Sequence, residues 1–151
     1  MSSSPQRAQR NTEAVGINAI TEAIIGAAMK VHSALGPGLL ESAYEACLAH
    51  ELRKAGFDVR SQVELPVIYD GVRVDIGYRI DLLVNDAVIV ELKCVEKIAP
   101  IHEAQILSYL KLSRKRVGLI INFHVRHLRM ESRGSLKERT EQLRVPLCPL
   151  W

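Results

Sequence analysis

The segment Val88–Val95 is the part of the sequence that most restricts the fold. It reads Val-Ile-Val-Glu-Leu-Lys-Cys-Val, with apolar residues at odd and even positions, which is typical of an interior strand covered on both faces. Glu91 and Lys93 interrupt it two residues apart, so they share one face, and Ile89 lies on that face too. Because buried charges are costly unless they are paired or metal-bound, the segment predicts either a structural ion pair or a functional site.

Helices and further strands are expected around this segment. Apolar residues recur at three- and four-residue steps from Ile17 to Val31, which predicts a helix with one buried stripe. Gly36-Pro37-Gly38 breaks that pattern, and a second helix is expected over Leu39–Lys54. The later elements are expected to be strands over Val59–Tyr69 and Val72–Val84, a helix over Pro100–Leu112 and a strand over Val117–Ile121, with turns at Asp70-Gly71 and Asn85-Asp86.

This order of elements predicts one α/β domain with a mixed central sheet flanked by helices. We expect a disordered tail over residues 1–13, the folded domain over 14–131 and a basic C-terminal extension over 132–151. The three cysteines are widely spaced, which suits reduced thiols in a cytoplasmic protein. No apolar stretch approaches the roughly 20 residues of a membrane span, and residues 1–10 contain no apolar run, so neither a membrane nor a secretory signal is expected.

Charge is distributed unevenly along the chain. Residues 1–110 carry 10 Lys/Arg and 14 Asp/Glu, a net of −4, whereas residues 111–151 carry 10 Lys/Arg and 3 Asp/Glu, a net of +7. A basic segment can follow a phosphate backbone, although basic surface loops that bind nothing are also common. If the acidic part holds a cation, we expect the basic segment to lie beside that site.

Asp81 lies on the strand that precedes Val88–Val95. If the two strands are joined by the three-residue loop Asn85-Asp86-Ala87, Asp81 pairs with Glu91 and both carboxylates project from one side. A two-residue turn would place them on opposite faces. Two hard oxygen ligands beside an ammonium suit a Mg²⁺ ion that keeps several waters. The alternative is a structural ion pair of Glu91 with Lys93 or Arg79.

Polar residues on the two expected helices could contribute to such a site. Glu41 follows the Gly-Pro-Gly turn and forms a polar group with Tyr44 and Glu45 at helical spacing. An acid in a first turn also simply favours the helix dipole, and polar stripes are often solvated helix faces. A second polar stripe, on the helix that Pro100 opens, consists of His102, Gln105 and Tyr109.

A glutamate on an early helix, an aspartate, a Glu-x-Lys strand and a glutamine on the next helix form a pattern that resembles the PD-(D/E)XK nuclease superfamily. Within it, Gly38–Tyr44 (Gly-Leu-Leu-Glu-Ser-Ala-Tyr) is similar to the signature of the GxxExxY family. The resemblance runs from Ile17 to Phe123, and Ile80 stands where many members have proline. It implies a restriction-endonuclease-like core with a mixed four-stranded sheet and an acidic cluster at one edge. Its other pieces are Gly77–Asp81, Val90–Lys93 and His102–Tyr109.

The resemblance implies a Mg²⁺- or Mn²⁺-dependent nuclease that hydrolyses phosphodiester bonds, with DNA as the expected substrate. Asp81 and Glu91 would hold the metal with the Leu92 carbonyl, and Glu41 would complete the site or bind a second ion. Lys93 would orient or activate the attacking water and stabilise the charge that develops on the phosphorane. Gln105 would steady substrate or water, and the supporting residues around the site would be Tyr44, His102 and Tyr109.

Other functions are compatible with the same residues. A non-catalytic nucleic-acid-binding module would use the basic stretch Lys111–Arg144, and a partner-binding protein would keep its acids in ion pairs. A zinc enzyme would need more than the pair His124 and His127, because no cysteine lies at finger spacing. No recognition domain is visible, so sequence-specific cutting would require a homodimer or another partner.

Overall fold

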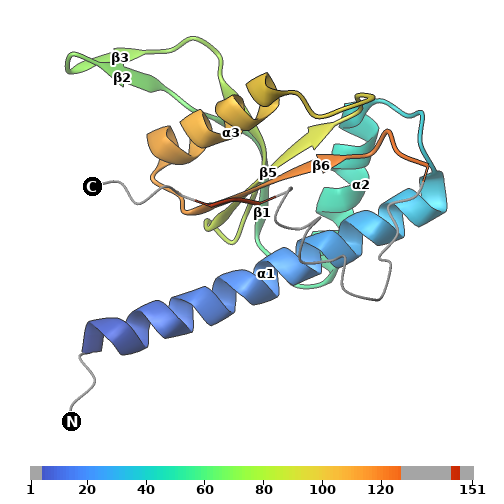
Figure 1. The fold of residues 1–151 in the computed structure, drawn as a ribbon, viewed down its shortest axis with the longest axis horizontal. Helices are drawn as coiled ribbons and strands as arrows, with labels where there is room; N and C mark the ends of the chain where they lie inside the picture. The colour runs from blue at the N-terminus through green and yellow to red at the C-terminus, as the bar shows by residue number, and fades with distance from the viewer. Residues whose placement is uncertain (1–4, 127–143, 147–151) are drawn as a thin grey trace.

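The computed structural model describes residues 5–126 and 144–146 of the chain. A five-stranded sheet of order β1-β4-β5-β6-β7 forms the centre, with helices on both faces, and a separate two-stranded hairpin projects from it (Figure 1). In chain order the elements are α1 (Pro5–Leu35), α2 (Glu41–Lys54), β1 (Val59–Glu64), β2 (Val67–Tyr69), β3 (Val72–Val74), β4 (Arg79–Val84), β5 (Val88–Lys93), α3 (Pro100–Ser113), β6 (Val117–Asn122) and β7 (Arg144–Pro146).

The central sheet is mixed and mostly antiparallel. Strand β4 pairs antiparallel with β1 and β5, and β7 pairs antiparallel with β6, whereas β5 and β6 are parallel and α3 connects them. This confirms the expected α/β class and is consistent with a restriction-endonuclease-like fold, with β7 as a fifth strand beyond the four that the resemblance implied. Val84 lies opposite Val88, so the connection is the expected three-residue loop Asn85-Asp86-Ala87.

The two ends of the chain differ from the expectation. Helix α1 begins at Pro5, although a disordered tail was expected over residues 1–13 and the helix only from Ile17. Proline is compatible with the first turn of a helix, and the Gln, Arg and Ala residues that follow it are favourable helix formers. At the other end, Arg144–Pro146 pairs with β6 and so joins the sheet, inside the range 132–151 that was expected to be an extension. The rest of that range lies outside the described residues.

The expected strand Val72–Val84 is divided into two parts that belong to different sheets. Strand β3 ends at Val74 and β4 begins at Arg79, and Gly77 lies between them with a φ of 75°. Glycine adopts this left-handed conformation without the steric penalty that a side chain would add. The break directs β3 into the projecting hairpin, while β4 enters the central sheet.

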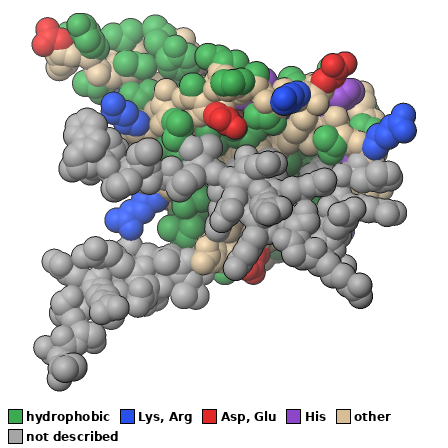
Figure 2. Space-filling view, in the orientation of Figure 1, with side chains coloured by type: hydrophobic (Ala, Val, Ile, Leu, Met, Phe, Trp, Pro, Cys, Tyr) green, Lys and Arg blue, Asp and Glu red, His purple; other side chains and the backbone are tan. Residues whose placement is uncertain are grey.

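The projecting hairpin is formed by β2 and β3 around the expected turn. Asp70 and Gly71 both have positive φ (51° and 71°), as a tight two-residue turn between twisted strands requires. Its apolar side chains face solvent in the described part of the chain: Tyr69 is 76% exposed and Val72 61%. Figure 2 shows hydrophobic side chains gathered over this hairpin at the upper left.

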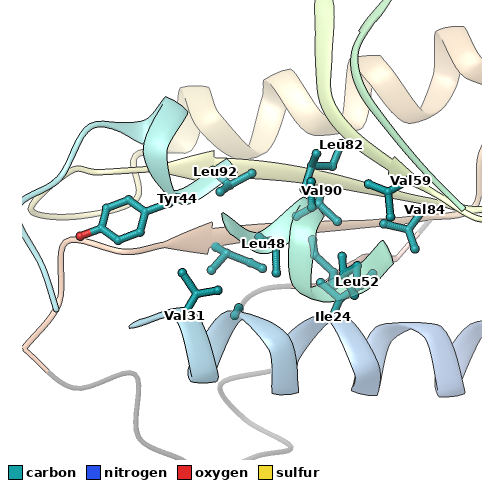
Figure 3. Close-up of a cluster of buried hydrophobic side chains, with 14 of the residues drawn as sticks. Ile24, Val31, Tyr44, Leu48, Leu52, Val59, Leu82, Val84, Val90 and Leu92 are labelled. Atoms are coloured by element: carbon teal, nitrogen blue, oxygen red, sulfur yellow. The ribbon is translucent and has the colours of Figure 1, made fainter. Parts of the chain in front are cut away.

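The core is divided between the two faces of the sheet. Helices α1 and α2 cover one face, where Leu48 and Val90 are fully buried (Figure 3). Helix α3 covers the other face, where Ile89 and Ile106 are fully buried. Gly118 on β6 permits the close approach of α3, because a Cβ atom there would lie 2.7 Å from Ile106 Cδ1. None of the helices among the described residues combines the length and apolar character that a membrane span requires.

Candidate active site

The pairing of β4 with β5 brings Asp81 and Glu91 together. The backbone N–H of Asp81 donates to Glu91 Oε1 at 3.3 Å, and the backbone N–H of Leu92 donates to Asp81 Oδ2 at 2.9 Å. The two carboxylates are therefore neighbours on adjacent strands, as the three-residue loop predicted. The Leu92 N–H thus contacts Asp81, and the metal-binding role expected of the Leu92 carbonyl stays a prediction.

The backbone is irregular where Asp81 lies. On one side of it Ile80 packs under α3, and on the other side Leu82 packs under α1 and α2, so the usual two-residue alternation of a strand breaks at Asp81. In the register of β1 with β4, Gln62 lies opposite Asp81, and it has a φ of 53°. Non-glycine residues adopt this conformation rarely, and such strain is commonest at functional sites.

Gln62 connects a third carboxylate to this pair. Its Nε2 donates to Glu45 Oε2 at 2.8 Å and to Asp81 Oδ1 at 3.5 Å. Partial burial raises the pKa of Glu45, and the negative charges of Asp81 and Glu41 raise this pKa further, against the hydrogen bond from Gln62. The acidic residues of α2 and β4 are thus electrostatically coupled.

Glu91 is a buried carboxylate whose negative charge the nearby cation Lys93 compensates only in part. Its side chain is only 4% exposed, and this burial, together with the nearby charge of Asp81, raises its pKa to about 8. Lys93 acts in the opposite direction but less strongly. Among the described residues no salt bridge includes Glu91, and Arg79 instead pairs with Glu64 at 3.6 Å. The structure therefore does not contain the structural ion pair that was the alternative for these residues.

Lys93 is connected to α3. Its Nζ donates to Gln105 Oε1 at 3.3 Å, and Gln105 Nε2 donates to Tyr109 Oη at 2.8 Å. Burial raises the pKa of Tyr109, and the charges of Glu91 and Asp81 contribute to this rise. Two members of the expected stripe on α3, Gln105 and Tyr109, therefore face the acidic pair rather than solvent.

His102, the third member of that stripe, supports the start of α3. Its Nδ1 accepts a hydrogen bond from the backbone N–H of Ala99 at 3.0 Å, and the backbone N–H of His102 donates to the Ala99 carbonyl at 2.9 Å. This reciprocal arrangement satisfies groups that a helix N-terminus otherwise leaves unpaired. The described contacts of His102 are with the helix end, one turn before Gln105.

Glu41 lies in the first turn of α2 and reaches the end of β5. Its Oε1 accepts a hydrogen bond from the backbone N–H of Cys94 at 3.1 Å. Within residues 5–126 and 144–146, no three His, Cys, Asp or Glu side chains are arranged to hold one metal ion. The geometry thus brings Asp81 and Glu91 together and places Glu41 of α2 against Cys94, directly after β5, and the described residues form no three-carboxylate cluster.

Tyr44 holds the turn that precedes Glu41. The fully buried side chain donates from Oη to the Gly36 carbonyl and accepts from the backbone N–H of Leu39 at 3.2 Å. Its ring stacks on Phe123, with centroids 4.4 Å apart and planes at 12°. Tyr44 therefore supports the site by fixing the start of α2, since its described contacts do not include the carboxylates.

Comparison with known families identifies the fold. A family model described as the PD-(D/E)XK nuclease superfamily matches residues 18–134, more than half of the chain. The chain belongs to the PD-(D/E)XK nuclease superfamily. No curated protein and no solved structure matches it. Membership in this superfamily suggests a nuclease, implies a nucleic acid substrate and is generally associated with divalent metals.

The acidic pair fits the divalent cation that this nuclease superfamily uses. Asp81 and Glu91 provide hard carboxylate oxygens on adjacent strands, and Mg²⁺ is typically held by one or two carboxylates with waters completing its shell. The burial of Glu91 next to a second carboxylate leaves negative charge that a cation would offset. The donor set therefore fits a two-carboxylate site better than a site with three protein carboxylates.

Lys115, a described residue of the basic segment 111–151, lies away from this nuclease-like site. Because β5 and β6 are parallel, with Val88 opposite Val117, the start of β6 lies at the far end of β5 from Lys93. Lys115 pairs with Asp86 at that far end, at 3.0 Å, and Val88 is about 10 Å along the strand from Glu91. The expectation that the basic segment lies beside the metal site is wrong for Lys115 and stays a prediction for the rest of the segment. Residues 127–143 and 147–151, including His127 of the possible zinc pair, lie outside the described residues.

Proposed function

We propose that this protein is a metal-dependent nuclease of the GxxExxY type that hydrolyses phosphodiester bonds in DNA. The observation that carries the proposal is the pair of neighbouring carboxylates of Asp81 on β4 and Glu91 on β5, the strand that also carries Lys93, in a chain of the nuclease superfamily. A protein that only binds nucleic acid has no need of buried acids near phosphate, since they repel it.

In this proposal Asp81 and Glu91 hold a Mg²⁺ or Mn²⁺ ion, with the Leu92 carbonyl as a further ligand. When bound, such an ion supplies Lewis-acid stabilisation of a phosphate oxygen and lowers the pKa of a bound water. Asp81 is fixed for this role because its carboxylate accepts the Leu92 N–H. Glu41 is the candidate for completing the site, and its hydrogen bond to the Cys94 N–H positions it beside the end of β5.

Lys93 would orient the attacking water and donate to the charge that develops on the phosphorane. Its ammonium is held by Gln105 Oε1, and Gln105 is itself held by Tyr109, so the group is positioned by a buried aromatic residue on α3. Gln105 would also steady the substrate. A cation that is already oriented costs little reorganisation when negative charge develops, which is the usual basis of electrostatic catalysis.

The proposed location is the cytoplasm. Cys47 and Cys94 are both free thiols, as a reducing compartment favours. Cys148 lies outside the described residues. We propose a homodimer only if the protein cuts DNA at specific sequences, because the chain shows no separate recognition domain.

The test is cleavage of supercoiled plasmid, single-stranded DNA and RNA by the purified protein with Mg²⁺, Mn²⁺ or EDTA. We expect DNA cleavage with either metal, none with EDTA, and a loss of roughly a thousandfold in Asp81→Asn, about 4 kcal/mol of transition-state stabilisation. Asp86→Asn is the matched control, because it changes the same residue type at the other end of the β4–β5 pair.

Two outcomes would contradict the proposal. One is the absence of cleavage with both metals, and the other is equal cleavage by Asp81→Asn and the wild type. Salt-sensitive DNA binding that survives Glu91→Gln, without cleavage, would instead favour a non-catalytic binding module.

A further inference from the structure

Gln62 has an unusual backbone conformation for a residue inside a strand. Its φ of 53° lies in the left-handed region, while the residues on either side of it, Ser61 and Val63, pair regularly with β4. A glycine would adopt this conformation without steric cost, and a glutamine does not. The structure therefore keeps a strained residue with a long polar side chain directly opposite Asp81.

The amide nitrogen of Gln62 donates to two carboxylates. It donates to Glu45 Oε2 at 2.8 Å and to Asp81 Oδ1 at 3.5 Å. The other oxygen of Asp81 accepts the Leu92 N–H at 2.9 Å. The Asp81 carboxylate is consequently held from both neighbouring strands, by β5 through a backbone donor and by β1 through Gln62.

Glu45 determines how the amide of Gln62 is oriented. A glutamine side chain can present either its NH₂ group or its oxygen, and the shorter bond to Glu45 requires the NH₂ group to face the carboxylates. Gln62 thereby places an amide donor between two acids without adding a charge that would compete with a cation. A lysine or arginine at this position would neutralise the acids and weaken the attraction of a metal ion.

We infer that Gln62 is a positioning residue that holds Asp81 for cation binding, and that Glu45 orients Gln62 rather than binding the cation itself. The inference rests on the proposed function, because it concerns the same acidic pair. Residues that orient metal ligands typically change metal affinity or activity by about 10- to 100-fold when they are replaced.

The first variant is Gln62→Gly, which removes the amide and at the same time relieves the backbone. Because glycine tolerates the φ of this position, we expect its thermal unfolding temperature to be equal to or above that of the wild type. We expect its affinity for Mn²⁺, measured by titration calorimetry, to fall by about 10- to 100-fold, and the rate of DNA cleavage to fall with it.

The second comparison is between Glu45→Gln and Glu45→Ala. The first keeps an oxygen that can accept the Gln62 amide, so we expect it to retain most of the Mn²⁺ affinity. The second removes the acceptor, and we expect about a tenfold loss. An equal loss in both variants would show that the charge of Glu45 is what matters, and would overturn its assigned role.

The wild type and Asp81→Asn separate this inference from the proposed function. If the wild type binds Mn²⁺ through Asp81 and Gln62→Gly binds and cleaves equally well, the positioning role of Gln62 is overturned and the nuclease proposal stands. If the wild type shows no Mn²⁺ binding that depends on Asp81, both are overturned.

Discussion

Asp86 and Glu91 lie on the same β4–β5 unit, but the two ends of the sheet surround these acids very differently. At the turn, the exposed Asp86 accepts from Lys115 at 3.0 Å and from Arg60 at 2.6 Å, and these partners lower its pKa. At the other end Glu91 is 4% exposed, its neighbour Asp81 is also acidic, and its pKa is raised to about 8.

The difference separates charges that have little effect on the stability of the fold from charges that lower it. An exposed, paired acid such as Asp86 is screened by solvent and contributes little to stability. A buried acid beside another acid destabilises the folded chain until a proton or a cation compensates it. Strongly shifted pKa values of this kind concentrate at functional sites, which is why the Glu91 end, and not the Asp86 end, supports a catalytic proposal.

Among the variants that compare the two ends of the sheet, the largest effect is expected from Lys93→Met, which removes the ammonium at the Glu91 end. We expect DNA cleavage to fall by roughly a hundredfold, because the donor to the developing charge is lost while the acidic pair remains. Mn²⁺ affinity measured by calorimetry should be retained. Unchanged cleavage in Lys93→Met would mean that this end of the sheet lacks the proposed chemistry.

Glu91→Gln is expected to change the pH dependence of stability in the absence of metal. Because the pKa of Glu91 in the folded chain (about 8) is above its ordinary value of 4.5, the native state binds the extra proton between these pH values. The stabilisation that protonation of Glu91 contributes is therefore fully present below pH 4.5 and is lost as the pH rises through 8, a total of about 5 kcal/mol.

Urea denaturation in EDTA across this pH range measures the effect. The free energy of unfolding of the wild type should fall from pH 5 to pH 8 relative to that of Glu91→Gln, whose amide does not titrate. If the free energies of unfolding of the two proteins depend on pH in the same way, the pKa of Glu91 is not raised in the folded chain.

Asp86→Asn is expected to have the smallest effect, since it weakens exposed pairs with Lys115 and Arg60. Its thermal unfolding temperature should stay close to that of the wild type, and the small difference should vanish in high salt. Its cleavage rate should be unchanged. A large loss of stability or activity in Asp86→Asn would contradict the claim that only the Glu91 end of the sheet has a catalytic role.

Local patterns predicted most of the fold. The double-sided apolar run of β5 required an interior strand, and the loop Asn85-Asp86-Ala87 fixed the register that makes Asp81 and Glu91 neighbours. The start of α1 and the pairing of Arg144–Pro146 with β6 were not predicted. The three-residue β7 joins the sheet through a distant partner, which a short sequence window does not show.

The sequence predicted that Asp81 and Glu91 lie together, but not which side chains contact them and their neighbours. Gln105 contacts Lys93, which no motif predicted, and His102 caps its own helix, because a polar stripe does not reveal which side chain bonds to its own backbone. Gln62 was missed since no motif contains it and a left-handed φ has no signature in a glutamine. Glu45 was noted only for its helical spacing, and the contact that involves it depends on β1.

The most direct test of the central claim is the effect of Mn²⁺ on thermal unfolding of the wild type, Asp81→Asn and Asp86→Asn. A cation that binds the folded acidic pair at about 100 times its dissociation constant stabilises by about 2.7 kcal/mol, which raises the unfolding temperature by roughly 5 to 10 °C. The account predicts this rise for the wild type and Asp86→Asn and its absence for Asp81→Asn. An equal rise in all three, or no rise in the wild type, would contradict it.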